Sequence, residues 1–514
     1  MRDEAPATTD LWELLEWRVR LTPHAEALVD RMGRRVTFAD LRDRSAAMAA
    51  GLRALGVLET QTVAWQLPTS IEAVELVLAL YHNGATQVPI IGVYRDLEVT
   101  HCCREAEVDW LLTTGTHNNF DFTELGLLVA SKLKLKHLSL TPDAVPQTDA
   151  RPPATTLSPD TPRWIFYTSG TNAVPKGARH TDQALAHAAA GLVRAMHLEA
   201  ADRYSLVFPL PHIGGIILLF AAFRSGCTHL LDGAFDPVTS PHFLARESVT
   251  HAGTGTPFHL AYLAAQRNDP TKRLFPSLKC CPGGAAPKPP TLHAQLKSEL
   301  GGVGIISSWG LTEAPILTCS HFDDSEEHLA STEGRPLPGV ELRTVAGNGT
   351  PTTIGEEGEL QVKAPQLTVG YVDSRLDADA FAEGWFRTGD LGMIDASGYV
   401  RITGRLKDVI IRNGENISAK EVEDLLFTHP RVVDVAVFGI PNERTGERVC
   451  ASIVTVSGLE PLQLKEMGTF LRELGLRPQA IPEQLEHVDA LPRNPAGKVT
   501  KDVLRRRVQT PGLG

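Results

Sequence analysis

The chain contains 514 residues, of which 42% are hydrophobic and 22% are charged, and its formal net charge is −11 at pH 7. This length is too great for one hydrophobic core, so two or more domains are expected. The negative charge argues against nucleic acid as the main partner, because binding to a phosphate backbone needs a large basic surface.

The cysteines and the apolar segments bear on the cellular compartment. Seven cysteines without a Cys-x-x-Cys spacing predict reduced thiols in a cytoplasmic protein rather than a disulfide framework or a zinc site. The polar, acidic N-terminus MRDEAPATTD lacks the pattern of a signal peptide. The longest apolar run, Ile213 to Phe223, is too short for a transmembrane segment and is expected in the core.

Strand-like and helix-like segments alternate through the first two-thirds of the chain. Residues 27–30 and 62–67 have the pattern of strands, whereas 40–56 and 69–84 carry apolar residues at helical spacing and end near glycine. This alternation predicts α/β layers with largely parallel sheets. The segment Pro142 to Pro162 is rich in proline, threonine and aspartate, and is expected to be a surface loop.

The pattern changes after about residue 335. Short alternating segments such as 358–364 and 398–404 predict antiparallel strands and turns. Ser418 and Glu421 form a candidate capping box for a helix, and 432–440 is expected to be a buried strand. We therefore predict two domains, with residues 1–406 in the first and 407–514 in a small α+β domain.

A glycine- and hydroxyl-rich loop lies within Trp164 to Thr181, WIFYTSGTNAVPKGARHT. It is not a Walker A loop, because Pro175 precedes the lysine and Gly177 follows it. Backbone N–H groups, hydroxyls and a mobile cation can nevertheless surround phosphate oxygens. The alternative is a Ser/Gly turn followed by a surface lysine. The candidate phosphate-binding residues are Thr168, Ser169, Gly170, Thr171 and Lys176.

This loop resembles the phosphate loop of the adenylate-forming superfamily, usually Tyr-Thr-Ser-Gly-Thr-Thr-Gly-x-Pro-Lys-Gly, with Asn172 in place of threonine and Ala173 in place of glycine. The superfamily contains acyl-CoA synthetases, luciferases and the adenylation domains of peptide synthetases. Each motif alone is also typical of a turn, a core residue or a solvated helix, but in family order they supply complementary parts of one reaction site. The six further motifs are FPLPHIGG (208–215), CCPGGAAPKPP (280–290), SSWGLTEAP (307–315), GWFRTGDLG (384–392), GRLKDVIIRNGENIS (404–418) and LPRNPAGKVTK (491–501).

The resemblance is closest to acyl-CoA synthetases and implies both a fold and a reaction. The implied fold is α/β, with a large N-terminal domain of layered α/β sheets that binds ATP and the acid, a small β-barrel-like subdomain, and a small mobile α+β C-terminal lid domain. The implied reaction joins a carboxylate to the α-phosphate of ATP, expels pyrophosphate, and then transfers the acyl group to CoA. ATP, Mg²⁺ and CoA are the implied cofactors.

The chemistry explains why cations dominate the implied site. A carboxylate is already an anion at pH 7, so the first step needs relief of charge repulsion rather than a general base. By resemblance, Lys498 reaches the carboxylate and α-phosphate, Thr312 donates to the α-phosphate, and Glu313 holds Mg²⁺. His212 borders the acid, and Lys407 is the hinge about which the small domain turns.

The nucleotide and thiol contacts also follow from the resemblance. Asp390 accepts hydrogen bonds from both ribose hydroxyls, and Arg405 contacts the ribose nearby. Trp309 stacks on adenine or borders the acid. The remaining implied residues are Gly284, Ala285, Ala286 and Gly310 beside the base, and Gly414, Glu415 and Asn416 along the thiol tunnel.

The sequence leaves the acid and the acceptor open. The expected pocket segments 212–220, 251–263 and 307–311 are apolar apart from His212 and His251, which favours a fatty, alicyclic, steroid-side-chain or aryl acid. CoA is the expected acceptor, and Arg505 to Arg507 either help to bind its phosphates or form a solvated helix face. The alternatives are loading of a separate carrier protein and a catalytically silent nucleotide-binding protein. A homodimer is left open as the state of assembly.

Overall fold

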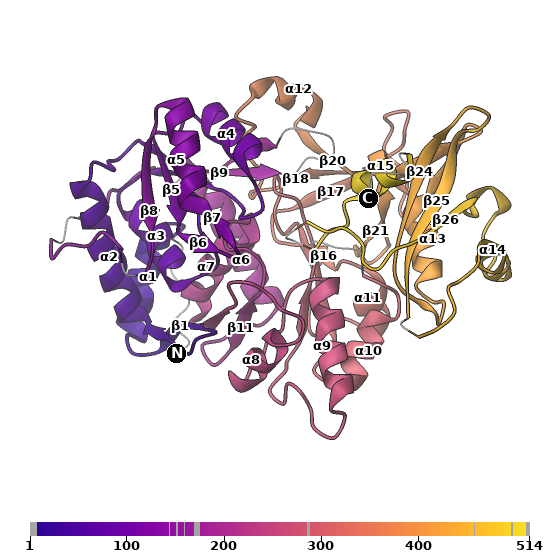
Figure 1. The fold of residues 1–514 in the computed structure, drawn as a ribbon, viewed down its shortest axis with the longest axis horizontal. Coiled ribbons are helices and arrows are strands. Elements are labelled where there is room, and N and C mark those ends of the chain that lie inside the picture. The colour runs from indigo at the N-terminus through magenta and orange to yellow at the C-terminus, as the bar shows by residue number, and fades with distance from the viewer. Residues whose placement is uncertain are drawn as a thin grey trace.

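A computed structural model describes residues 8–142, 144–150, 153–158, 160–168, 175–284, 288–456, 458–494 and 497–509. Figure 1 shows a large N-terminal part, indigo to dark orange, beside a smaller C-terminal part in light orange and yellow. Both parts combine helices with sheets, which confirms the predicted α/β class with a large N-terminal and a small C-terminal domain.

A six-stranded sheet in the order β10-β9-β4-β3-β5-β8 forms one layer of the N-terminal part. Both faces are covered, because successive side chains of a strand point to opposite sides. On β3, Trp65 packs in one core with α3, α6 and α7, whereas Ala64 packs in another with α4 and α5. The strands are β3 (Thr62–Gln66), β4 (Thr86–Pro89), β5 (Trp110–Thr114), β8 (Lys136–Leu140), β9 (Pro162–Thr168) and β10 (Lys176–Thr181).

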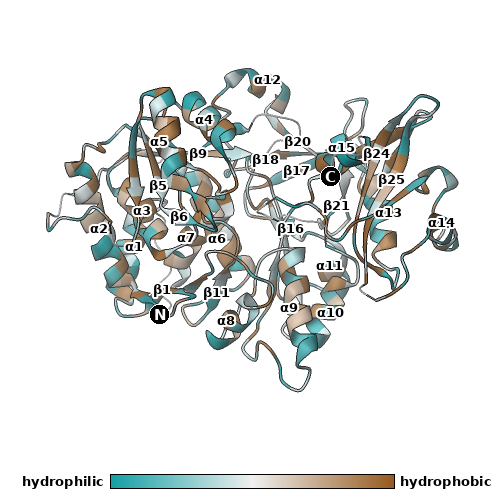
Figure 2. Ribbon diagram, viewed as in Figure 1, coloured by the Kyte–Doolittle hydropathy of each residue, from teal (hydrophilic) through white to brown (hydrophobic). Residues whose placement is uncertain are grey.

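The pairing of this sheet confirms the prediction of largely parallel strands. Strands β4, β5, β8 and β9 pair in parallel, and β10 runs antiparallel to β9. Figure 2 shows both hydrophilic teal and hydrophobic brown along outer helices such as α5. The helices and the small hairpin of this region are α1 (Leu11–Leu21), α2 (Phe38–Ala54), α3 (Ile71–His82), α4 (Asp96–Glu105), β6 (Thr116–His117), β7 (Phe120–Asp121), α5 (Phe122–Leu133), α6 (Asp182–Ala195) and α7 (Ile213–Ser225).

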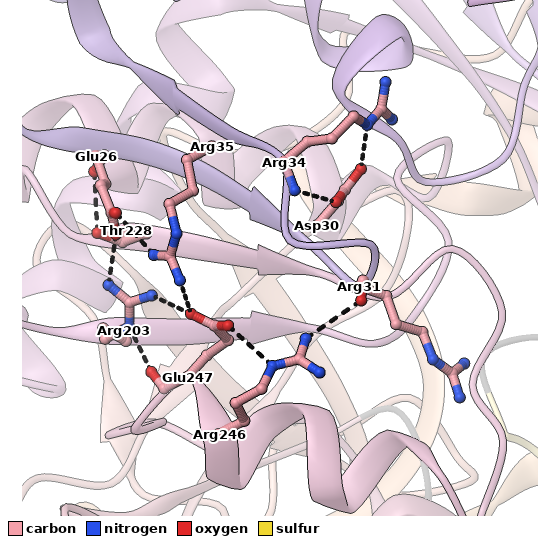
Figure 3. Close-up of polar contacts among 9 residues, drawn as sticks. All are labelled: Glu26, Asp30, Arg31, Arg34, Arg35, Arg203, Thr228, Arg246 and Glu247. Carbon is pink, nitrogen blue, oxygen red and sulfur yellow. Dashed lines mark hydrogen bonds and ion pairs between the residues drawn. The ribbon is translucent and has the colours of Figure 1, made fainter.

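A second sheet, in the order β11-β12-β1-β2, is tied together by the ionic network of Figure 3. The buried carboxylate of Glu247 pairs with Arg35 at 2.7 Å and with Arg203 at 3.0 Å, and both arginines also reach Glu26. This network joins strands that lie almost two hundred residues apart in the chain. The elements are β1 (Glu26–Asp30), β2 (Arg35–Thr37), β11 (Arg203–Leu206), β12 (Thr228–Leu231), α8 (Ser240–Arg246) and α9 (Thr256–Asn268).

The rest of the N-terminal part contains several short strands and one ten-residue strand, β20. An antiparallel sheet of β17 to β21 has its own apolar core around Leu360 and Val362, which fits the strand-and-turn pattern predicted after residue 335. The elements are β13 (Cys281–Gly283), α10 (Leu292–Glu299), β14 (Ile305–Trp309), β15 (Thr318–Cys319), α11 (Glu326–Ser331), β16 (Arg335–Pro336), β17 (Glu341–Val345), β18 (Gly358–Lys363), η1 (Ser374–Leu376), α12 (Asp377–Ala380), β19 (Phe381–Ala382), β20 (Trp385–Ile394) and β21 (Val400–Arg405).

The C-terminal part has a sheet in the order β23-β22-β25-β24, with β26 parallel to β25, and a separate apolar core. The 3-10 turn η2 (Leu406–Asp408) lies between β21 and the first strand of this sheet, and the predicted division at 406/407 stays a prediction. The elements are β22 (Val409–Arg412), β23 (Glu415–Ser418), α13 (Ala419–Leu426), β24 (Val432–Asn442), β25 (Gly446–Thr455), α14 (Leu464–Glu473), η3 (Pro478–Ala480), β26 (Gln484–His487) and α15 (Lys501–Gln509).

Two local predictions can be compared directly with the structure. The Ser418 side chain accepts a hydrogen bond from Glu421 N at 3.2 Å, which confirms the predicted helix start. The reciprocal hydrogen bond of a capping box, from Ser418 N to the Glu421 side chain, is not formed among the described residues. The apolar run from Ile213 forms the buried helix α7, as expected. Within the described part of the chain, no helix combines the length and apolar character needed to cross a membrane.

Candidate functional site

Two adjoining cavities gather residues from both parts of the chain. The larger has a volume of about 1400 Å³ and the smaller about 210 Å³, and both are lined by Gly284, Gly310, Arg405 and Lys498. The larger cavity is also lined by Thr168, Lys176, His212, Thr312, Glu313 and Lys407. The smaller cavity is also lined by Trp309 and Asp390. These predicted residues, which range from Thr168 to Lys498 in the sequence, therefore meet at one place.

Part of the predicted phosphate loop lies outside the described residues. This applies to Ser169, Gly170, Thr171, Asn172 and Ala173, and also to Ala285 and Ala286 beside the expected base site. The flanks of the loop are described, and they form the antiparallel hairpin of β9 and β10, in which Thr168 pairs with Lys176. Thr168 and Lys176, at the ends of these two strands, both line the larger cavity.

The segment that carries Thr312 and Glu313 is held from behind by two side chains that the sequence motifs did not single out. His180 Nε2 lies 2.8 Å from the carbonyl oxygen of Thr312, and burial lowers the pKa of His180 to about 4, so its ring is neutral and donates this hydrogen bond. The hydroxyl of Tyr371 donates to Glu313 Oε1 at 2.7 Å. Both contacts leave the other side of the segment open to the cavity.

Asp390 is held by one hydrogen bond and one ion pair. Its Oδ2 accepts a hydrogen bond from Trp309 Nε1 at 2.8 Å, and its Oδ1 lies 2.5 Å from Arg405 Nε. The Asp390 side chain is buried, and the Trp309 ring packs in the apolar core of the β17–β21 sheet while lining the smaller cavity. Since each carboxylate oxygen has two lone pairs, Asp390 keeps acceptor capacity for a ligand.

Lys498 enters the site from the C-terminal part. Its backbone N–H donates to Asn494 Oδ1 at 2.9 Å, and the adjoining Gly497 packs closely against Pro257 at the start of α9. Burial, followed by repulsion from Arg405 and Lys407, lowers the pKa of the Lys498 ammonium to about 7. An anion that entered between these three cations would reverse this shift.

The family models agree with this geometry. One model, described as AMP-binding enzyme, matches residues 15–372, and a second, described as AMP-binding enzyme C-terminal domain, matches residues 421–498. The chain belongs to the AMP-binding enzyme family. This assignment confirms the predicted adenylate-forming superfamily and identifies an AMP-forming acid–thiol ligase similar to acyl-CoA synthetases.

Individual relatives cover nearly the whole chain. The medium-chain fatty-acid–CoA ligase of Escherichia coli (strain K12) is 28% identical over 515 residues, which cover 97% of this chain and 90% of that protein. The salicyl-AMP ligase / salicyl-S-ArCP synthetase of Mycobacterium tuberculosis is 30% identical over 492 residues, covering 92% of this chain and 85% of that protein. The crystal structure of ATP-bound MatB from Rhodopseudomonas palustris matches with a TM-score of 0.88 at 26% identity, covering 98% of this chain and 99% of that one.

One end of the larger cavity of this AMP-binding enzyme is apolar. Its walls come mainly from α6, β11, α7 and the loops that follow β11 and precede α9. His212 caps the N-terminus of α7 by accepting from Gly214 N at 3.2 Å, and burial lowers the pKa of His212 to about 4, which keeps it neutral. The lining residues of this end are Leu192, Met196, Tyr204, Phe208, His212, Ile213, Ile217, Leu218, Thr254 and Pro282.

Sequence reasoning found only part of this wall. His251, expected in the pocket, is fully buried and stacks behind Tyr204, with ring centroids 5.8 Å apart, so it does not line the cavity. The sequence analysis missed Leu192 on α6, Met196 at the C-cap of α6 and Tyr204 on β11, because they lie between the recognised motifs rather than within them. No local pattern distinguishes these residues from other core residues.

The predicted thiol-tunnel residues lie away from both cavities. Gly414 lies in the exposed turn between β22 and β23, and Glu415 and Asn416 are the first residues of β23. Glu415 contacts Gln479, and the carbonyl oxygen of Asn416 accepts from Arg477. Their predicted role needs a second arrangement of the C-terminal part and stays a prediction.

The described residues also fit a nucleotide-bound Mg²⁺. Glu313 offers one carboxylate at the cavity wall, and Mg²⁺ is commonly held by one or two carboxylates together with substrate phosphates. In the described ranges, no cluster of three or more His, Cys, Asp or Glu side chains has the arrangement of a metal site. A shared site between Glu313 and a triphosphate is consistent with both observations.

Proposed function

We propose that this protein is an ATP-dependent acyl-CoA ligase that activates a monocarboxylic acid through an acyl-adenylate. Apart from its carboxylate, the acid is apolar and carries no charge. The observation that carries the proposal is the larger cavity, which joins a cationic end with Lys176, Arg405 and Lys498 to an apolar end between α6 and α7. An acid can place its carboxylate among the cations and its body between the helices.

In the first step, an oxygen of the acid carboxylate attacks the α-phosphorus of ATP. A new P–O bond forms, the bond to the β-phosphate breaks, and pyrophosphate leaves with the bonding electron pair. Two unit charges 4 Å apart repel by about 4 kcal/mol at an effective dielectric of 20, so charge compensation is the main requirement. Lys498 offsets the charge on the carboxylate and α-phosphate, Thr312 donates to the α-phosphate, and Lys176 with Thr168 holds the outer phosphates.

Other groups orient the nucleotide. Asp390, held by Trp309 and Arg405, accepts from the ribose hydroxyls. Glu313 is placed to hold Mg²⁺, which neutralises phosphate charge when bound.

In the second step, the sulfur of a thiol attacks the acyl carbonyl and a C–S bond forms. The C–O bond to the phosphate breaks, AMP leaves with the bonding electron pair, and the thiol proton is released to solvent. The charge of Lys498 is no longer needed in this step, and by resemblance to the superfamily the thiol arrives after the C-terminal domain has moved. We infer that the C-terminal domain, residues 407–514, turns about Lys407, withdraws Lys498 and brings Gly414, Glu415 and Asn416 to the site. A hinge of this kind needs only a few residues to absorb the change.

The chemistry of the apolar end supports the class of acid. The charged side chains on the larger cavity come from α4, the phosphate hairpin, the Thr312 segment, the η2 region, the segment that carries Lys498, and α15. The acid end contributes Tyr204, Thr254 and neutral His212 as its polar groups, so a second carboxylate, a sulfonate or an ammonium on the substrate would be buried without a counter-charge. Fatty, alicyclic and aryl monocarboxylic acids satisfy this condition.

A panel of acids tests the proposal. Purified protein is incubated with ATP, Mg²⁺, CoA and monocarboxylic, dicarboxylic and amino acids of matched size, and products are identified by mass spectrometry. We expect AMP, pyrophosphate and an acyl-CoA from apolar monocarboxylic acids. Acid-dependent ADP formation, or no acid-dependent exchange of pyrophosphate into ATP with any acid, would refute acyl-adenylate chemistry.

A separate carrier protein is the second candidate acceptor, because one relative is a salicyl-AMP ligase / salicyl-S-ArCP synthetase. Release of AMP that depends on CoA in the pure protein supports CoA. Accumulation of acyl-AMP that CoA does not discharge supports the carrier.

A further inference from the structure

Tyr371 lies between two groups assigned to the triphosphate. Its hydroxyl donates to Glu313 Oε1 at 2.7 Å, and the Lys176 ammonium lies 5.9 Å from the centre of its ring, within the range of a cation–π contact. The Tyr371 side chain is 6% exposed and does not line either cavity, so it stands behind Glu313 rather than in the substrate space.

The backbone around Tyr371 fixes it to both segments. Thr368 N donates to the carbonyl oxygen of Glu313 at 2.7 Å, and Val372 N donates to the carbonyl oxygen of Gly177 at 2.8 Å. Tyr371 N itself donates to Asp377 Oδ1 at 2.9 Å. The short segment 368–372 therefore bridges the phosphate hairpin and the Thr312–Glu313 segment, with Tyr371 at its centre.

This arrangement allows one oxygen of Glu313 to be held while the other is left for a ligand. A carboxylate that rotates freely loses orientational entropy when it binds a metal, whereas a carboxylate fixed by a hydrogen bond has lost that freedom in advance.

We propose that Tyr371 is a positioning residue for the Mg²⁺ that accompanies ATP: its hydroxyl orients the Glu313 carboxylate, and its ring holds the Lys176 ammonium beside the same phosphates. This inference rests on the proposed function for the identity of the nucleotide reaction. It predicts that loss of the hydroxyl alone weakens metal binding more than it weakens acid binding or folding.

The direct test is Tyr371→Phe, which keeps the ring and removes the donor. Mn²⁺ is used as the probe and its affinity for the complex of the protein with α,β-methylene-ATP is measured by electron paramagnetic resonance. Loss of a group that orients a metal ligand commonly costs roughly tenfold or more in metal affinity, and we expect a loss of about that size. In ATP–pyrophosphate exchange, saturating Mg²⁺ should restore most of the rate, and the KM of the acid should change little.

Tyr399→Phe is the matched control. The Tyr399 hydroxyl also donates to a carboxylate, Asp324 Oδ1, at 2.6 Å, and Tyr399 is buried to a similar degree at 7% exposure. Unlike Glu313, Asp324 does not line either cavity. Mn²⁺ affinity should remain that of the wild type in this variant. An equal loss in both variants would overturn the inference, because it would reflect a general effect of removing a buried hydroxyl.

A double-mutant cycle with Glu313→Gln gives a second criterion. If Tyr371 acts through Glu313, Tyr371→Phe should cause little further loss of Mn²⁺ affinity once Glu313 is changed. Additive losses, or wild-type Mn²⁺ affinity in Tyr371→Phe, would overturn the inference. Failure of the wild type to exchange pyrophosphate would refute the proposed function instead, while the Mn²⁺ measurements would still decide the role of Tyr371.

Discussion

The two sides of the site differ in how their polar groups are held. On the N-terminal side, neighbouring side chains hold Thr312, Glu313 and Asp390, whereas no side chain among the described residues holds the ammonium of Lys498 on the C-terminal side. Thr312 and Glu313 are backed by His180 and Tyr371, and Asp390 is held by Trp309 and Arg405. In the described part of the chain, Lys498 Nζ has no hydrogen bond or ion pair, although its backbone is fixed by Asn494. The rigid side suits the recognition of a nucleotide, and the unsupported cation suits a group that is needed in one half-reaction and withdrawn in the other.

Lys498→Ala should have the largest effect, and it tests the role of the cation on the C-terminal side of the site. Losing an electrostatic catalyst costs about 3–4 kcal/mol, so adenylate formation should fall by about 10²–10³-fold or more. Thioester formation from supplied acyl-adenylate should survive, because the lysine is not needed after the first step. The two half-reactions are measured separately, and equal loss in both would contradict the assigned role.

Lys407→Pro should have the opposite effect on the two half-reactions: it should spare adenylate formation and impair thioester formation. Proline fixes φ near −65° and restricts Leu406, so one of the two domain arrangements should become inaccessible. We expect pyrophosphate exchange with acid to continue while acyl-CoA formation falls by more than about tenfold, a loss of over 1.4 kcal/mol in the second step. Circular dichroism controls for folding, and normal rates for both half-reactions in folded protein would place the hinge elsewhere.

Trp309→Phe tests how much the hydrogen bond to Asp390 contributes to ATP binding on the N-terminal side of the site. The variant removes the N–H that holds Asp390 Oδ2, and a hydrogen bond to a charged group contributes about 1.5–3 kcal/mol, so the KM for ATP should rise by roughly tenfold or more. The rise should shrink when 2′-deoxy-ATP replaces ATP, because the affected carboxylate then has one hydroxyl fewer to bind. A thermal melt reports the accompanying loss of core packing, and an equal rise for both nucleotides would argue against a role through the ribose.

The pH dependence should give the smallest effect. With a pKa near 7 in the free protein, the Lys498 ammonium is mostly present at pH 6 and mostly lost at pH 8, so kcat/KM for ATP in the exchange reaction should fall as pH rises across this interval, by about tenfold or less. In Lys498→Arg, kcat/KM for ATP should fall much less between pH 6 and pH 8, because the guanidinium group stays charged. An unchanged profile in Lys498→Arg would assign the fall to another group.

Much of the molecule was predictable from short-range sequence patterns. Helical spacing located α2 and α3, alternation located β18 and β21, and seven ordered motifs indicated the family and the residue types of the site. These features depend on residues close together in the chain, where periodicity and turn chemistry act directly.

Only the tertiary structure decided what holds those residues in place. His180 and Thr312 are 132 positions apart, Trp309 and Asp390 are 81 apart, and Tyr371 and Glu313 are 58 apart, so no local pattern marks these pairs. The walls of the acid end and the lowered pKa of Lys498 likewise arise from burial between distant segments. The sequence by itself determined which chemical groups are present, and the packing of distant elements determined their orientation and charge, because desolvation and hydrogen bonding act through space rather than along the chain.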